Sequence, residues 1–169
     1  MAHHQHSKGS LARRLAFLSL AWPLLASAHV SLHEPTAVQG AYHRAAFKVG
    51  HGCAGSPTTE LAVLLPEGVT SARPMPKPGW QLVSEPTPTG TRVVWRGGPL
   101  DDQHYDEFVM QFKVTAAAGP VWFPVEQRCA QGRNDWKERP ATGTSTQGLR
   151  YPAVLLEVVA PSAGGHAHH

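Results

Sequence analysis

The chain has 169 residues, of which 41% are hydrophobic, with 15 lysines and arginines, 12 acidic residues and a formal net charge of +3. The whole excess comes from Lys8, Arg13 and Arg14, because no acidic residue precedes residue 29. Residues 29–169 therefore carry 12 groups of each sign, and this balance argues against a nucleic-acid or anionic-membrane partner.

The first segment, residues 1–28, has the pattern of a secretory signal peptide. A basic region is followed by the apolar run LAFLSLAWPLL at 15–25, which is too short to cross a bilayer, and Ala26 and Ala28 take the −3 and −1 positions. We predict Sec-type export with cleavage after Ala28, and a periplasmic or secreted protein. Arg13-Arg14 leaves a twin-arginine signal as the alternative. No later stretch is apolar enough to predict a membrane span.

Short β-type runs separated by prolines and glycines follow, at 29–33, 41–49, 59–65, 80–84, 91–96, 105–115, 120–128 and 152–159. Several of them alternate; Phe108, Met110 and Phe112, for example, fall on one face of a strand. No window shows a helical period. We therefore predict one all-β domain over 29–160, an antiparallel β-sandwich or barrel, with a flexible histidine-rich tail at 161–169.

The two cysteines, Cys53 and Cys129, are far apart in the chain. In an oxidising compartment such a pair usually forms one disulfide, which is the prediction here. The alternative is a thiolate metal site, which two isolated cysteines without a CxxC motif make poorly.

Cleavage after Ala28 would make His29 the first residue. Its α-amine and ring Nδ1 can then chelate one metal ion, and a second imidazole completes a T-shaped set of three nitrogens that favours Cu(II). The α-amine loses its proton readily near neutral pH, because its ordinary pKa is about 7.7–8. The alternative is that cleavage merely happens to leave a histidine there.

His51 is the best candidate for the second imidazole, because it stands between two glycines and two residues before Cys53. His33 lies too far along the strand from residue 29, while His43 and His104 are expected at exposed strand or turn positions. Trp136, in a polar segment after Cys129, is either a core residue or an aromatic wall over a site, and the residues alone favour the core.

Seven segments stand in order between residues 29 and 139: HVSL, AYHRAAFKVGHGCAGSPTT, LPEGV, PMPKPGW, VVWRGGPL, DDQHYDEFVMQF and FPVEQRC, followed by Trp136. Together they resemble the YcnI-like (DUF1775) family of exported copper-binding proteins. The resemblance implies a β-sandwich of cupredoxin-like or cupin-like appearance, Cu(II) held by an N-terminal histidine brace, and a tryptophan beside the metal at Trp136. Relatives without the cysteines carry an Asn-Glu pair where this chain has His51-Gly52, so His51 is the natural substitute for the glutamate.

The expected function is Cu(II) binding for copper handling or delivery, with no enzymatic activity. Copper ion is the expected ligand, and other periplasmic copper chaperones or a membrane copper transporter are the expected partners. One alternative is a copper mono-oxygenase acting on polysaccharide, which the low aromatic content of 8% disfavours. The other is a metal-free extracellular β-domain.

Overall fold

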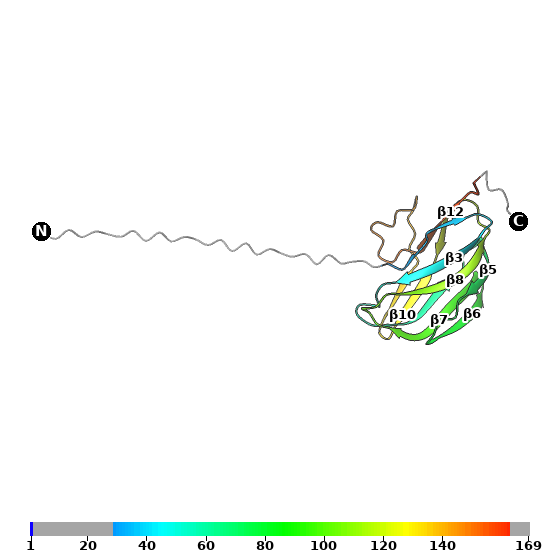
Figure 1. The fold of residues 1–169 in the computed structure, drawn as a ribbon. Coiled ribbons are helices and arrows are strands. Elements are labelled where there is room, and N and C mark those ends of the chain that lie inside the picture. The colour runs from blue at the N-terminus through cyan, green and yellow to red at the C-terminus, as the bar shows by residue number, and fades with distance from the viewer. Residues whose placement is uncertain (2–28, 163–169) are drawn as a thin grey trace.

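The computed structural model describes Met1 and residues 29–162. The rest of the predicted signal peptide, residues 2–28, and the last seven residues of the predicted tail lie outside the described residues. All regular secondary structure in the described part is β-strand, and no described segment is a helix that could cross a membrane. Figure 1 shows the strands packed into one body.

The first sheet has four strands in the order β1 (Ser31–Leu32), β3 (Tyr42–Val49), β8 (Asp106–Val114) and β5 (Val69–Pro74). Its centre is the antiparallel pair β3–β8, which stays in register from Tyr42 opposite Lys113 to Val49 opposite Asp106. The predicted alternation is confirmed, since Phe108, Met110 and Phe112 are all buried on the inner face of β8.

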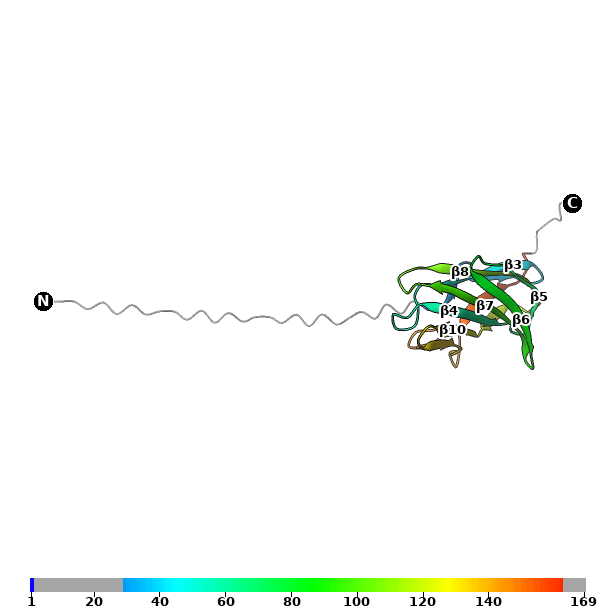
Figure 2. The same ribbon diagram turned by 90° about the horizontal axis from the view of Figure 1, so that it is seen from below.

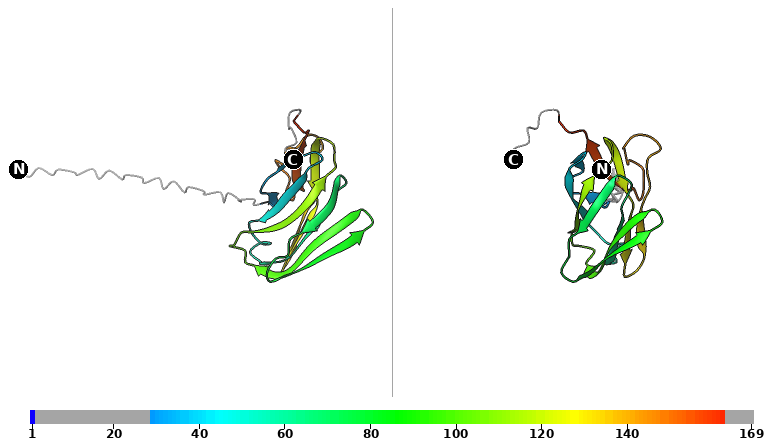
Figure 3. Two further views of the ribbon diagram at one scale, coloured as in Figure 1. Left: turned by 45° about the vertical axis from the view of Figure 1, so that its right-hand side comes forward. Right: turned by 90° about the vertical axis from the view of Figure 1, so that its right-hand side faces the viewer.

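The second sheet has five strands in the order β11 (Arg133–Trp136), β10 (Val125–Cys129), β4 (Thr58–Leu64), β7 (Gly90–Leu100) and β6 (Trp80–Thr87). All of its pairings are antiparallel. The long β6–β7 pair lies along one edge of the molecule (Figure 3).

A third, three-stranded sheet has the order β2 (Thr36–Val38), β12 (Val154–Val159) and β9 (Gly119–Phe123). Here β12 pairs with β9 in the antiparallel sense but with β2 in the parallel sense. This is the one departure, among the described strand pairs, from the antiparallel arrangement predicted for the domain.

The core lies between the layers and is rich in aromatic side chains. Trp95 of β7 meets Phe108 of β8 with ring centroids 5.7 Å apart, and Phe47 of β3 meets Phe123 of β9 at 5.6 Å. Figure 2 shows β3 and β8 in one layer and β4 and β10 in the other. These contacts confirm the predicted β-sandwich.

The predicted strand 120–128 is two strands in the structure. Pro124 has no N–H with which to continue a ladder, and its carbonyl accepts a hydrogen bond from the N–H of Leu64 at 3.0 Å. Before Pro124 the chain forms β9, which pairs with β12, and after Pro124 it forms β10, which pairs with β4. The proline therefore passes the chain from the three-stranded sheet to the five-stranded one.

His43 is buried, contrary to the exposed position expected from the sequence. It follows the inward alternation of β3, is only 8% exposed, and packs against Phe112 with ring centroids 5.8 Å apart. Its Nε2 is buried and has no hydrogen-bond partner in the described part of the chain. Burial lowers the pKa of His43, and the backbone and charge of Glu34 oppose that shift.

Candidate metal site

His29 lies at the entrance to the domain, two residues before β1. The ladder pairs Ser31 with Lys48, and continuing its register by two residues would set His29 opposite Gly50, next to His51. The His29 ring is half-buried and meets the Trp136 ring edge-on, with centroids 5.7 Å apart. His29 also lines a cleft, and Thr144 is among the other residues that line it.

His51 lies in the loop between β3 and β4, and its ring is oriented by a local hydrogen bond. The Nδ1 atom is 2.6 Å from the carbonyl oxygen of Gly52. Because a carbonyl oxygen only accepts, this contact assigns the proton to Nδ1, and in the neutral ring the lone pair is then on Nε2. Histidines that bind metals commonly have this arrangement, with one ring nitrogen donating to a carbonyl and the other facing the metal.

The peptide unit between His51 and Gly52 is held on both edges. Its carbonyl oxygen accepts a hydrogen bond from Gln127 Nε2 at 2.7 Å, and its N–H donates to Asp102 Oδ1 at 2.9 Å. A β-carbon added at Gly52 would overlap the carbonyl oxygen of Ser56. Glycine is therefore required where the loop folds back on itself.

The predicted disulfide is confirmed. Cys53 and Cys129 are bonded, with their α-carbons 5.9 Å apart. Within the same loop, Cys53 and Ser56 exchange two backbone hydrogen bonds of 3.0 Å. The bridge thus fastens the end of the His51 loop to β10.

Trp136, at the end of β11, is a core residue that also contacts His29. It is 2% exposed, and its ring meets the Tyr151 ring at 5.4 Å on another side. Its Nε1–H donates to Gln127 Oε1 at 3.1 Å. The two readings of Trp136 considered from the sequence are therefore compatible, because the same indole fills the core and flanks His29.

Gln127 joins these groups, and the sequence analysis missed it. Its side chain bonds the loop of His51 and the indole of Trp136 at once. A signal for it was available: alternation along β10 puts residue 127 on the same face as Val125 and Cys129. A glutamine between a buried valine and a disulfide cysteine is a candidate for a buried, fully bonded polar group.

The two exposed histidines of the described residues, His33 and His104, lie outside this arrangement. His33 Nδ1 is 3.2 Å from Glu107 Oε1, with its side chain 58% exposed. His104 is exposed in a turn, where its N–H donates to the carbonyl of Asp101. In the described part of the chain, no three His, Cys, Asp or Glu residues group closely enough to hold a metal. A histidine brace needs only two such residues, since the α-amine is its third donor.

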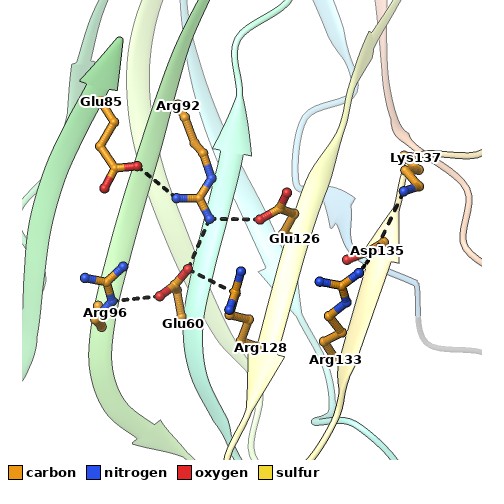
Figure 4. A network of polar contacts seen from close by, with 9 residues as sticks. All are labelled: Glu60, Glu85, Arg92, Arg96, Glu126, Arg128, Arg133, Asp135 and Lys137. Carbon is orange, nitrogen blue, oxygen red and sulfur yellow. Dashed lines mark hydrogen bonds and ion pairs between the residues drawn. The ribbon is translucent and has the colours of Figure 1, made fainter. Parts of the chain in front are cut away.

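The outward face of the five-stranded sheet carries a separate ion-pair cluster, drawn in Figure 4. Glu60 is paired with Arg96 at 2.7 Å, Arg92 at 3.1 Å and Arg128 at 3.5 Å. Burial alone would raise the pKa of Glu60, but the hydrogen bonds and charges of these arginines outweigh burial and hold the pKa below its ordinary value. Alternation along β10 directs Arg128 outward and Gln127 inward, so the cluster and the histidine site lie on opposite faces of the sheet.

Among solved structures, the chain is similar to an uncharacterized protein from Nocardia farcinica with an immunoglobulin-like fold. The two share 29% identity with a TM-score of 0.65, over 77% of this chain and 97% of that one. The seventh ScaB type I cohesin from Pseudobacteroides cellulosolvens aligns at 13% identity and a TM-score of 0.47, over 83% and 97%. The search of curated proteins finds no match.

The family comparison agrees with the segments quoted from the sequence. The family described as "Domain of unknown function (DUF1775)" matches residues 29–158, which is nearly the whole described domain. The chain belongs to the DUF1775 family, and its domain is an all-β sandwich similar to an immunoglobulin-like fold.

Proposed function

We propose that the protein is exported, is cleaved after Ala28, and binds one Cu(II) ion through the mature N-terminus. The α-amine and ring Nδ1 of His29 supply two nitrogens, and Nε2 of His51 supplies the third. The observation that carries this proposal is the ring orientation of His51, whose Nδ1–H is used by the Gly52 carbonyl so that Nε2 retains its lone pair.

The donor set fits copper better than other common metals. Three nitrogens with no thiolate and no cluster of carboxylates suit Cu(II), which leads the divalent affinity order and favours tetragonal nitrogen sites. Calcium and magnesium require oxygen ligands instead. Trp136 adds no ligand atom, because an indole N–H only donates and here it donates to Gln127. Its role is to shield one side of the His29 ring from water.

The protein's task in this proposal is copper handling or delivery in the periplasm or outside the cell, without catalysis. In this proposal the metal lies at the edge of the sandwich, beside the cleft that His29 lines. A metal at such an edge is accessible to a second protein, such as a periplasmic copper chaperone or a membrane copper transporter.

The test compares the mature protein beginning at His29 with the same protein carrying one extra alanine before it. Competition titration with a Cu(II) chelator measures affinity, and electron paramagnetic resonance counts the coupled nitrogens. The extension removes the α-amine from the chelate ring, so we expect Cu(II) affinity to fall at least tenfold. Removing groups that only hydrogen-bond to metal ligands already costs 10–100-fold in affinity. Equal affinity of the two proteins would refute the brace.

His51→Ala tests the second ligand, with His33→Ala as the matched control. His33 is an exposed histidine near the same strand, already paired with Glu107. We expect His51→Ala to lose one coupled nitrogen and at least tenfold in affinity, and His33→Ala to change neither. The opposite ranking would move the ligand assignment to His33.

A further inference from the structure

We infer that Gln127 is a positioning residue for the metal site, holding the His51 loop and the Trp136 indole in one hydrogen-bonded unit. This inference rests on the proposed function, because it concerns how the same site is held. Gln127 bonds the backbone of His51 and not its ring, whose Nδ1 bonds the Gly52 carbonyl. It acts on the metal site through the backbone of His51, and its bond to the Trp136 indole fixes the orientation of its own amide.

The side chain of Gln127 is almost fully buried, at 1% exposure. Its Nε2 donates both hydrogens, one to the carbonyl of His51 at 2.7 Å and one to Thr58 Oγ1 at 2.8 Å. Its Oε1 accepts from Trp136 Nε1 at 3.1 Å. A buried amide with all its donors used is costly to remove, since each deserted partner loses its own bond.

The partners also fix which way the amide points. The indole N–H of Trp136 can only donate, so it must face the oxygen of Gln127. The carbonyl of His51 can only accept, so it must face the nitrogen. A flipped amide would lose both bonds. The spacing of the two groups is therefore set by the length and orientation of one side chain.

The hydrogen bond from Gln127 to the His51 carbonyl controls the direction of the His51 ring. Gln127 holds the carbonyl edge of the peptide unit between residues 51 and 52, while Asp102 holds its N–H edge. The next carbonyl, that of Gly52, is the acceptor for His51 Nδ1. With the carbonyl edge released, the peptide unit can rotate, the Nδ1 bond is no longer enforced, and Nε2 is no longer the only nitrogen with a lone pair. Metal sites held less rigidly by their surrounding groups typically lose 10–100-fold in affinity.

The first test needs no copper. Nitrogen-15 NMR of the metal-free protein reports which ring nitrogen of His51 carries the proton. We expect the Nδ1–H form in the natural protein and a mixture of both forms in Gln127→Met, which keeps the length of the side chain but none of its hydrogen bonds. Thr58→Val is the matched control, because it removes one bond of the same amide at an equally buried residue without touching His51 or Trp136. It should leave the Nδ1–H form intact.

The second test measures Cu(II) affinity in a double-mutant cycle. We expect Gln127→Met to weaken binding at least tenfold, Thr58→Val to change it less than twofold, and Gln127→Met to have no further effect in a His51→Ala background. If Gln127→Met proves unfolded by circular dichroism, Gln127→Asn replaces it, because the shortened amide cannot reach both His51 and Trp136. These outcomes would support the inference.

Two results would overturn it. One is a folded Gln127 variant with the natural tautomer of His51 and the natural copper affinity. The other is an affinity loss that persists in the His51→Ala background, which would mean that Gln127 acts by a route other than His51. Failure of the natural protein to bind Cu(II) would refute the proposed function instead, and the metal-free NMR measurement would still decide whether Gln127 orients His51.

Discussion

Removing the disulfide should cost this domain a large share of its stability. The Cys53–Cys129 bond joins residues 76 positions apart. For a loop of that length, the chain-entropy relation gives about 4.5 kcal/mol at 25 °C, because the crosslink restricts the unfolded chain. For a domain of this size, with an unfolding entropy of about 2.1 cal/mol/K per residue, that loss lowers Tm by about 15 °C.

The measurement is thermal unfolding by calorimetry of the oxidised natural protein and of the Cys53→Ala/Cys129→Ala variant, both without metal. The natural protein treated with a reductant is the control, because it opens the same loop without altering the sequence. Both should melt at about the same temperature, well below the oxidised form. A drop of less than about 4 °C in the double variant would show that the crosslink does not restrain the unfolded chain as this reasoning requires.

The other predictions concern the charged and polar groups around the sandwich. The lowered pKa of Glu60 means that its ion pairs stabilise the fold fully above its unfolded pKa of about 4.3, and that this contribution is lost as pH falls through the lower folded value. Measured by urea unfolding, the free energy of unfolding of Glu60→Gln should be lower than that of the natural protein at pH 7. The difference between the two proteins should shrink as pH drops from 7 to 3. The lowered pKa of His43 makes the neutral ring the form that the fold prefers, so its contribution is lost as pH falls below about 6.5. The free energy of unfolding of His43→Leu should depend less on pH between 7 and 5 than that of the natural protein. An unchanged dependence would refute the claim that the fold prefers a neutral His43. Asp102→Ala should weaken Cu(II) binding severalfold by releasing Gly52, whereas Asp101→Ala, one residue away, should not. Incubation with polysaccharide, ascorbate and peroxide should yield no oxidised sugars if the protein is not a mono-oxygenase.

Much of the sandwich was predictable because apolar alternation carries it. In β3 and β8, apolar residues at alternate positions face inward. The expected oxidising compartment predicted the disulfide. Strands β2, β5 and β11 were missed because they are short, mainly polar or exposed, so their pairing comes from neighbouring strands and leaves no apolar pattern.

The geometry of the candidate site was harder to predict. The sequence pointed to His29, His51 and Trp136 through cleavage chemistry, loop composition and the family resemblance. Alternation along β10 marks Gln127 as a buried polar residue, but not its partners, because a hydrogen bond between residues 76 positions apart depends on the tertiary fold and not on local sequence. His43 was placed wrongly for another reason: it shares the inward face of Ala45 and Phe47, but its polar side chain suggested exposure.

The tight turn at Gly52 has a consequence for exchanging loops between relatives. A glutamate at position 52, which the family resemblance would lead one to introduce, cannot coexist with the turn that pairs Cys53 with Ser56, because its β-carbon would occupy the place of the Ser56 carbonyl. A glutamate at that position is therefore incompatible with the conformation that this loop adopts. Transplanting the glutamate into this chain requires the whole segment 51–56 to be replaced, while a ligand at position 51 can be varied with the crosslink kept.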